Sequence, residues 1–218
     1  MTATGAFLLA FPALFSIVNP PGSALLFREV TAGFAAGERA WLAGKVAVYS
    51  ALVILGALWG GAYVLNFFGI TLDALRLAGG AVVTANAWRM LNAPDQPRES
   101  EAGAKAERGR ARAIAFFPLT LPLTAGPGTI SVAVTLGAER PPPGPELIGF
   151  FLGATLAAVA VAASVWASYR SAERLDSLLG EAGRRAVTRL TAFLLLCIGV
   201  QIMLNGAVHT LEALHLGG

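Results

Sequence analysis

Long apolar runs constrain this chain more than any other feature of its sequence. Six segments carry very little charge: about 5–27, 42–65, 71–91, 113–137, 147–168 and 187–207. A helix that crosses a bilayer needs about 20 mostly apolar residues. Only 13% of the residues are charged, whereas soluble domains carry about 25%. The sequence therefore predicts an all-α membrane protein with six transmembrane helices.

One long polar segment divides these runs into two groups. Residues 92–112 read "NAPDQPRESEAGAKAERGRAR", which is rich in charge, alanine and glycine. Three apolar runs precede the segment and three follow it. We therefore expect a first three-helix repeat over 1–91, a charged cytoplasmic loop over 92–112 and a second three-helix repeat over 113–218.

The basic residues predict the orientation of these helices. Of the sixteen Lys and Arg residues, only Arg76 and Arg140 belong to the side that holds both termini; the other fourteen flank the opposite ends of the spans. Cytoplasmic loops hold the excess of positive charge in membrane proteins. Both termini are therefore predicted outside the cell. Because topology explains the net charge of +3, we expect no nucleic-acid partner.

The two halves resemble each other without gaps. From Phe11 the chain reads "FPALFSIVNPPGSA", and from Phe117 it reads "FPLTLPLTAGPGTI". Pro-Gly pairs fall on each other in this alignment, and Ser23 falls on Thr129. Three spans is an odd number, so the second copy enters the membrane from the opposite side. The pattern predicts a 3+3 inverted-topology repeat, as in many secondary transporters.

Prolines lie near the middle of the first predicted span. Pro20 and Pro21 have no N–H, so the carbonyl groups of Ser16 and Ile17 lose their helical partners. The residue before a proline, here Asn19, is pushed away from helical geometry. Unpaired backbone groups survive at membrane depth only inside protein or beside a wet cavity. We therefore expect the first helix to be broken in mid-membrane.

The fourth predicted span has the same feature. Pro127 removes the helical partner of the Leu123 carbonyl group, and Gly126 precedes it as Asn19 precedes Pro20. Glycine tolerates almost any backbone angle, which suits Gly128 to such a break. We therefore expect the fourth helix to be broken as well. The alternative is that the prolines are structural kinks only.

A pair of broken helices predicts a binding site for a small zwitterion. The half-helices that start near Gly22 and Gly128 would present free N–H groups and a positive dipole end, which favour a carboxylate. Hydroxyl groups of Ser23 and Thr129 could donate there as well. The carbonyl groups freed on the preceding half-helices could accept from an ammonium group or hold a cation.

These segments resemble a known family. "NPPGSALLF", "FPLTLPLTAGPGTI" and the ending "RLTAFLLLCIGVQIMLNG" resemble the MarC family, which includes small neutral amino acid transporters of the SnatA type. The resemblance implies an inner-membrane protein that transports amino acids such as glycine, alanine, serine and threonine. Many members carry a small aliphatic residue where this chain has Pro21. The family's two broken segments fall on Asn19, Pro20, Pro21 and Gly22, and on Thr124, Ala125, Gly126, Pro127, Gly128 and Thr129.

Two other polar residues within the spans are candidates for substrate contact. Asn86 lies in the third span and Gln201 in the sixth. Polar side chains inside a membrane face the bundle interior, where they bind a substrate or join two helices by a hydrogen bond. The pairs Gly56/Gly60 and Gly149/Gly153 have the spacing of closely packed helices.

Residue types that are absent from the predicted spans reduce the number of possible functions. No Asp or Glu lies in the middle of a span, so a carboxylate proton relay is not expected. No hydrolase or metalloprotease motif is present, and we expect no enzyme, cofactor or metal site. The sequence predicts a secondary transporter whose partners are small neutral amino acids, the lipid bilayer and a coupling ion, H⁺ or Na⁺. The alternative is a channel-like or structural membrane protein without a substrate cycle.

Overall fold

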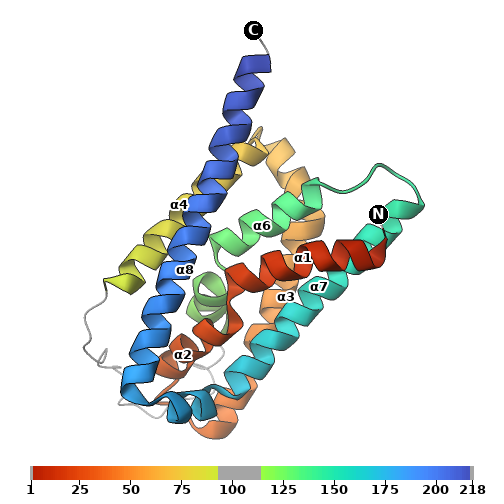
Figure 1. Cartoon of the computed structure of the whole chain (residues 1–218). Coiled ribbons are helices and arrows are strands. Elements are labelled where there is room, and N and C mark those ends of the chain that lie inside the picture. Colours follow the sequence, from red (N-terminus) through yellow and green to blue (C-terminus); the bar gives the residue numbers. More distant parts are fainter. Residues whose placement is uncertain (1, 93–113, 217–218) are drawn as a thin grey trace.

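The computed structural model describes residues 2–92 and 114–216, and all regular elements in these two ranges are helices (Figure 1). Apart from Asn92, the predicted loop over 92–112 lies outside the described residues. The elements in chain order are α1 (Ala3–Val18), α2 (Pro20–Val30), α3 (Ala36–Phe67), α4 (Leu72–Leu91), the π-helix η1 (Ala115–Thr124), α6 (Pro127–Ala138), α7 (Pro145–Arg170) and α8 (Ala172–Leu216).

Within these ranges, four helical segments are long and apolar enough to cross a membrane. They are Ala3–Arg28, Ala36–Phe67, Pro145–Arg170 and Ala192–Glu212. A fifth apolar helix, Pro127–Ala138, is shorter. The predicted span 71–91 corresponds to α4, and the predicted span 113–137 corresponds to η1 and α6. Neither of these two predicted spans is found as a helix that is both long and apolar enough to cross a membrane. α4 is less apolar than the four segments above, and α6 is short.

Helix α7 turns small side chains toward the interior and large apolar ones outward. The buried residues of α7 include Ala154, Ala157 and Ala158, whereas Ile148 is 74% exposed and Leu156 is 51% exposed on the same helix. Water would make such an outer surface costly. Lipid tails are as apolar as these side chains, and small residues let membrane helices approach closely. This distribution therefore fits a chain folded in a bilayer.

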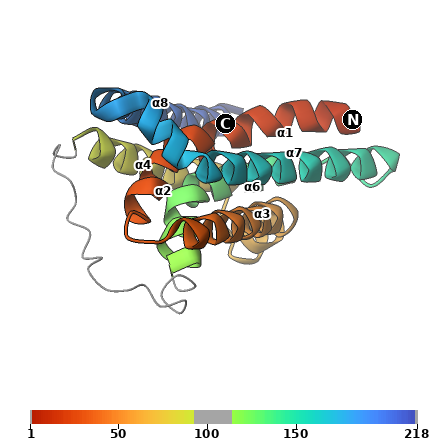
Figure 2. The same ribbon diagram turned by 90° about the horizontal axis from the view of Figure 1, so that it is seen from below.

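Helices of the two halves pack mainly against each other. α4 packs along α8, α1 along α7, and α3 against both α6 and α7. Figure 2 shows α1 and α7 side by side. The short elements α2, η1 and α6 meet in the region between these long helices (Figure 1). The two changes of helix at Asn19 and Gly126 therefore lie inside the bundle.

Two glycines allow helices to touch backbone to backbone. A Cβ atom at Gly137 of α6 would lie 1.9 Å from the carbonyl oxygen of Leu58 in α3. A Cβ atom at Gly153 of α7 would lie 2.0 Å from the carbonyl oxygen of Ala3 in α1. Real Cβ atoms never approach oxygen so closely, so only glycine fits at either position.

The predicted role of Gly56 and Gly60 in close packing is wrong. A Cβ atom at either glycine would meet nothing within 4 Å in the described part of the chain. The neighbouring Gly61 is the close contact of α3, since its Cβ atom would lie 2.3 Å from Cγ2 of Val134 in α6. The spacing identified the correct helix but the wrong face.

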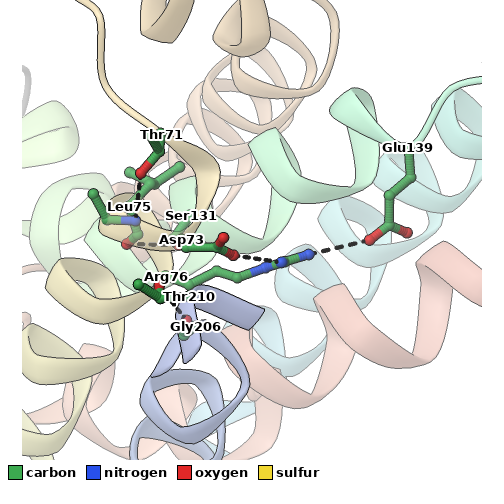
Figure 3. A network of polar contacts seen from close by, with 9 residues as sticks. Thr71, Asp73, Leu75, Arg76, Ser131, Glu139, Gly206 and Thr210 are labelled. Atoms are coloured by element: carbon green, nitrogen blue, oxygen red, sulfur yellow. Dashed lines mark hydrogen bonds and ion pairs between the residues drawn. The ribbon is translucent and has the colours of Figure 1, made fainter. Parts of the chain in front are cut away.

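An ion-pair network fastens α4 to the end of α6. Arg76 contacts Asp73 at 3.0 Å and Glu139 at 3.3 Å, and its side chain is only 14% exposed. Figure 3 shows the Arg76 side chain reaching from α4 toward Glu139, with Asp73 beside it. The Ser131 hydroxyl donates to the Leu75 carbonyl oxygen at 3.3 Å on the same interface. These contacts hold α6 in place against α4.

Candidate functional site

The first change of helix occurs at Asn19. α1 ends at Val18, and Asn19 has the left-handed values φ 45° and ψ 65°. Within the two described ranges it is the non-glycine residue with positive φ. Asparagine adopts this conformation more readily than most residues. Pro20 follows as the first residue of α2, where its fixed φ suits a helix start.

Asn19 caps both helices that meet at this point. Its N–H donates to the Phe15 carbonyl oxygen at 2.8 Å, and its side-chain Oδ1 accepts from the Gly22 N–H at 3.3 Å. The Ser23 hydroxyl donates to the Val18 carbonyl oxygen at 2.7 Å, with the Asn19 carbonyl oxygen 2.9 Å away. The hydroxyl therefore donates to carbonyl groups near the point where the helix is interrupted and N–H donors are missing.

These contacts correct the prediction of free N–H groups at the start of α2. Pro20 and Pro21 have no N–H, the Gly22 N–H is capped by Asn19, and the Ser23 N–H donates to the Asn19 carbonyl oxygen at 2.9 Å. No free donor is left in this turn. The Pro20 side chain is buried and that of Pro21 is exposed.

The second change of helix extends over η1. Phe117 (φ −128°, ψ 121°) and Leu121 (φ −114°, ψ 122°) have extended backbone inside this element. Each directly precedes a proline, Pro118 or Pro122, and a proline disfavours helical geometry at the residue before it. Two such residues four positions apart loosen the helical turn, which explains the wide π-helical hydrogen bonding.

Threonine hydroxyls add hydrogen bonds to carbonyl groups within this element. The Thr120 hydroxyl donates to the Ala115 carbonyl oxygen at 2.7 Å, and the Thr124 hydroxyl donates to the Leu119 carbonyl oxygen at 2.7 Å. Ala125 lies between η1 and α6 and is fully buried. Its N–H donates to the Thr120 carbonyl oxygen at 2.8 Å.

The start of α6 differs from the start of α2. Gly126 is extended (φ −75°, ψ −179°) and caps the helix without a side-chain hydrogen bond. Pro127 follows and has no N–H. The N–H groups of Gly128 and Thr129 have no hydrogen-bond partner among the residues that the structure describes. Both residues are buried, so two unpaired donors and the positive dipole end face the protein interior.

Gly128 brings the two changes of helix together. A Cβ atom at this glycine would lie 2.1 Å from Cγ2 of Val83 in α4 and 3.4 Å from Cδ1 of Ile17 in α1. Ile17 precedes Asn19 by two residues. The start of α6 is therefore packed directly against the end of α1 and against α4.

Tyr169 of α7, which the sequence analysis did not identify, contacts residues of both interruptions. Its hydroxyl lies 2.7 Å from the Thr124 hydroxyl, and it donates there because the Thr124 proton is used on Leu119. The Ser23 hydroxyl is also within interaction range of Tyr169. The ring stacks on Phe27 with centroids 4.4 Å apart. A tyrosine beside an arginine at the end of a span resembles an ordinary interfacial residue, so no sequence signal marked it.

Neither of the two other candidates has a described contact with this cluster. Gln201 is exposed on α8, and its amide donates to the Asn205 side chain at 2.9 Å, so its hydrogen bond is within one helix. Asn86 lies in α4, but its side chain is outside the part that the structure describes. Among the described residues, no three His, Cys, Asp or Glu side chains gather at a metal-binding distance.

Comparison with known proteins gives one consistent result. The model of the "MarC family integral membrane protein" matches residues 4–211. The inner membrane protein MarC of Citrobacter koseri is 33% identical over 213 residues, which cover 95% of this chain and 96% of the relative. The proteins of the same name from Salmonella typhimurium and Escherichia coli O1:K1 / APEC are each 32% identical, with the same coverage. No solved structure matches the chain.

Proposed function

This chain belongs to the MarC family of integral membrane proteins, and from that premise we propose that it is a multi-pass inner-membrane transporter of small neutral amino acids. Its substrates are of the glycine, alanine, serine and threonine type. The observation that carries the proposal is the pair of buried, unpaired N–H groups of Gly128 and Thr129. Such a helix start favours a carboxylate.

The surroundings of these donors suit the rest of a zwitterion. Ile17 is two residues before Asn19. Its carbonyl group has no helical donor, because Pro21, four residues later, has no N–H. We expect it to accept from an ammonium group. The nearest side chains to Gly128 are Val83 and Ile17, both apolar. A charged substrate side chain left unpaired against such walls costs several kcal/mol. The site therefore favours small neutral side chains.

An inverted 3+3 repeat is part of the proposal. It is supported by the pairs of elements that pack together. If α1, α2, α3 and α4 are exchanged for η1, α6, α7 and α8, then the α1–α7 contact becomes the η1–α3 contact, and α2–α7 becomes α6–α3. The α4–α6 contact becomes α8–α2, and α3–α7 and α4–α8 are unchanged. In this arrangement the first and fourth transmembrane helices each cross the membrane as two half-helices.

The proposed orientation has both termini outside the cell. Arg28, Arg39, Arg170 and Arg174 gather where α2 ends and α8 begins, whereas the C-terminus lies at the top of Figure 1 and the N-terminus at its right, both away from that region. Positive charge is retained on the cytoplasmic side. A cysteine added at the C-terminus is expected to react with an impermeant thiol reagent in intact cells. Labelling that requires opened cells would contradict this orientation.

Saturable exchange of labelled alanine in proteoliposomes tests the function. Vesicles loaded with unlabelled alanine are expected to take up labelled alanine at a rate that saturates, with competition by glycine or serine but not by lysine or glutamate. Imposed H⁺ or Na⁺ gradients then identify the coupling ion. Uptake that rises linearly with alanine concentration would favour the channel-like alternative. No uptake above that of protein-free vesicles would contradict the proposal.

Replacement of Tyr169 by phenylalanine tests the link between the two interruptions. The Tyr169→Phe variant keeps the ring stack on Phe27 but loses the hydroxyl bonded to Thr124. One lost hydrogen bond corresponds to about 1 kcal/mol, so we expect about a fivefold lower exchange rate with little change in Tm. Tyr63→Phe, on an exposed ring, is the control. An unchanged exchange rate in Tyr169→Phe would show that the hydroxyl has no part in transport.

A further inference from the structure

Tyr169 also lines a basic cavity. The cavity has a volume of about 370 Å³ and opens between the end of α2, the start of α3, the end of α7 and the start of α8. Its lining includes Phe27, Arg28, Arg39, Tyr169, Arg170 and Glu173. The proposed orientation makes this the cytoplasmic end of the protein.

The arginines of the cavity differ in how they are paired. Arg39 donates to the Phe34 carbonyl oxygen and to the Glu173 carboxylate. The Arg170 guanidinium lies 5.8 Å from the Trp166 ring centroid. The Nε of Arg28 is buried and has no partner in the described part of the chain. Arg28 also lines the cavity, and a guanidinium group that lines a cavity is suited to bind an anionic group.

One aromatic pair links the cavity to the interruptions. Phe27 and Tyr169 both line the cavity and stack on each other with centroids 4.4 Å apart. The hydroxyl of Tyr169 contacts the Thr124 hydroxyl of η1 at 2.7 Å. The cavity and the second interruption therefore share Tyr169.

We propose that this cavity is the cytoplasmic entry site of the transport path, where Arg28 holds the carboxylate of an amino acid and Glu173 faces its ammonium group. The inference rests on the proposed function. Glu173 is paired with Arg39 and places one carboxylate in a cavity lined by arginines, so both charges of a zwitterion have a partner of opposite sign. A phosphate group, as in a lipid headgroup, also binds guanidinium groups, and the tests below distinguish the two. The site takes small carboxylate-bearing zwitterions, which then pass the Phe27–Tyr169 pair.

Thiol reactivity tests the cavity without any need for transport. Ala36 is exposed and lines the cavity, and the native Cys197 is exposed. Ala36→Cys is therefore prepared in a Cys197→Ser background. We expect an anionic thiosulfonate to react several-fold faster than a cationic one, and Arg28→Gln to remove most of that difference. Saturating alanine is expected to slow the reaction. Ile70→Cys, at the opposite end of the molecule, is the control that alanine leaves unchanged.

Transport kinetics provide a second test of the entry site. Because hydrogen bonds to charged groups are stronger than neutral ones, Arg28→Gln is expected to raise the KM for alanine on the cytoplasmic side about tenfold with little change in kcat. Arg28→Lys is expected to restore part of this affinity. Arg140→Gln, whose guanidinium stacks on Tyr63 at the other end, is expected to leave the KM unchanged.

The outcomes separate this inference from the proposed function. Normal alanine exchange with an unchanged KM in Arg28→Gln would overturn the entry site and leave the transporter standing. Protection of Ala36→Cys by alanine in a protein that exchanges no alanine would support the binding site and overturn transport. Protection by phosphatidylglycerol in phosphatidylcholine vesicles, without protection by alanine, would assign the cavity to lipid phosphate and overturn the inference.

Discussion

Gly128→Ala is expected to abolish alanine exchange, whereas Gly61→Ala is expected to retain most of it. The new Cβ atom at Gly128 would lie 2.1 Å from Cγ2 of Val83, so the start of α6 must shift. The unpaired N–H groups of Gly128 and Thr129 are in this turn. A displacement of about 1 Å at such donors is enough to lose a well-aligned carboxylate. Exchange in proteoliposomes measures the loss.

Gly61 provides a control with an almost equal clash. Its Cβ atom would lie 2.3 Å from Cγ2 of Val134, on the interface between α3 and α6 and away from both interruptions. Both substitutions crowd a single valine side chain, so their packing costs are similar, about 1–3 kcal/mol. Equal loss of exchange in the two variants, at equal Tm, would mean that overpacking alone is responsible. Normal exchange in Gly128→Ala would place the substrate elsewhere.

Gly137→Ala is expected to destabilise the protein markedly. Its Cβ atom would lie 1.9 Å from the Leu58 carbonyl oxygen, and a backbone atom cannot rotate away as a side chain can. α3 and α6 must separate, with an expected cost of at least the 1–3 kcal/mol or so typical of overpacking. Thermal unfolding in detergent should show a markedly lower Tm.

Gly56→Ala is the matched control in α3. Nothing described lies within 4 Å of its new Cβ atom, and alanine is favoured over glycine inside a helix by about 1 kcal/mol. Its Tm is therefore expected to stay the same or rise. A lower Tm for Gly56→Ala than for Gly137→Ala would contradict the packing of α3 and α6 described above.

Local rules made much of the backbone predictable from the sequence. A proline disfavours helical geometry at the residue before it, and the chain leaves helical geometry at Asn19, Phe117 and Leu121, each directly before a proline. The rule is not absolute, since α1 continues through Pro12. Apolar composition likewise predicted the long helices. Their ends were less predictable: the span predicted over 42–65 became Ala36–Phe67, because polar residues at helix ends are also helical.

Contacts between distant residues were not predictable in the same way. The pairing of Tyr169 with Thr124 joins residues 45 positions apart, and no periodicity encodes it. The Gly22 N–H was predicted to bind a carboxylate, but it donates to the Asn19 side chain instead. The sequence offers both acceptors and does not say which one the N–H contacts. The assignment of Gly56 and Gly60 failed for a related reason, since small-residue spacing does not say which face meets a neighbour.

The rate at which a thiol reagent modifies Thr129→Cys, with and without alanine, is the most direct test of the central claim. Thr129 carries one of the two unpaired N–H groups at the start of α6. In a Cys197→Ser background, saturating alanine is expected to slow this modification several-fold and to leave Ala138→Cys, exposed at the far end of the same helix, unaffected. Equal rates at Thr129→Cys with and without alanine would show that the substrate does not bind where the two interrupted helices meet.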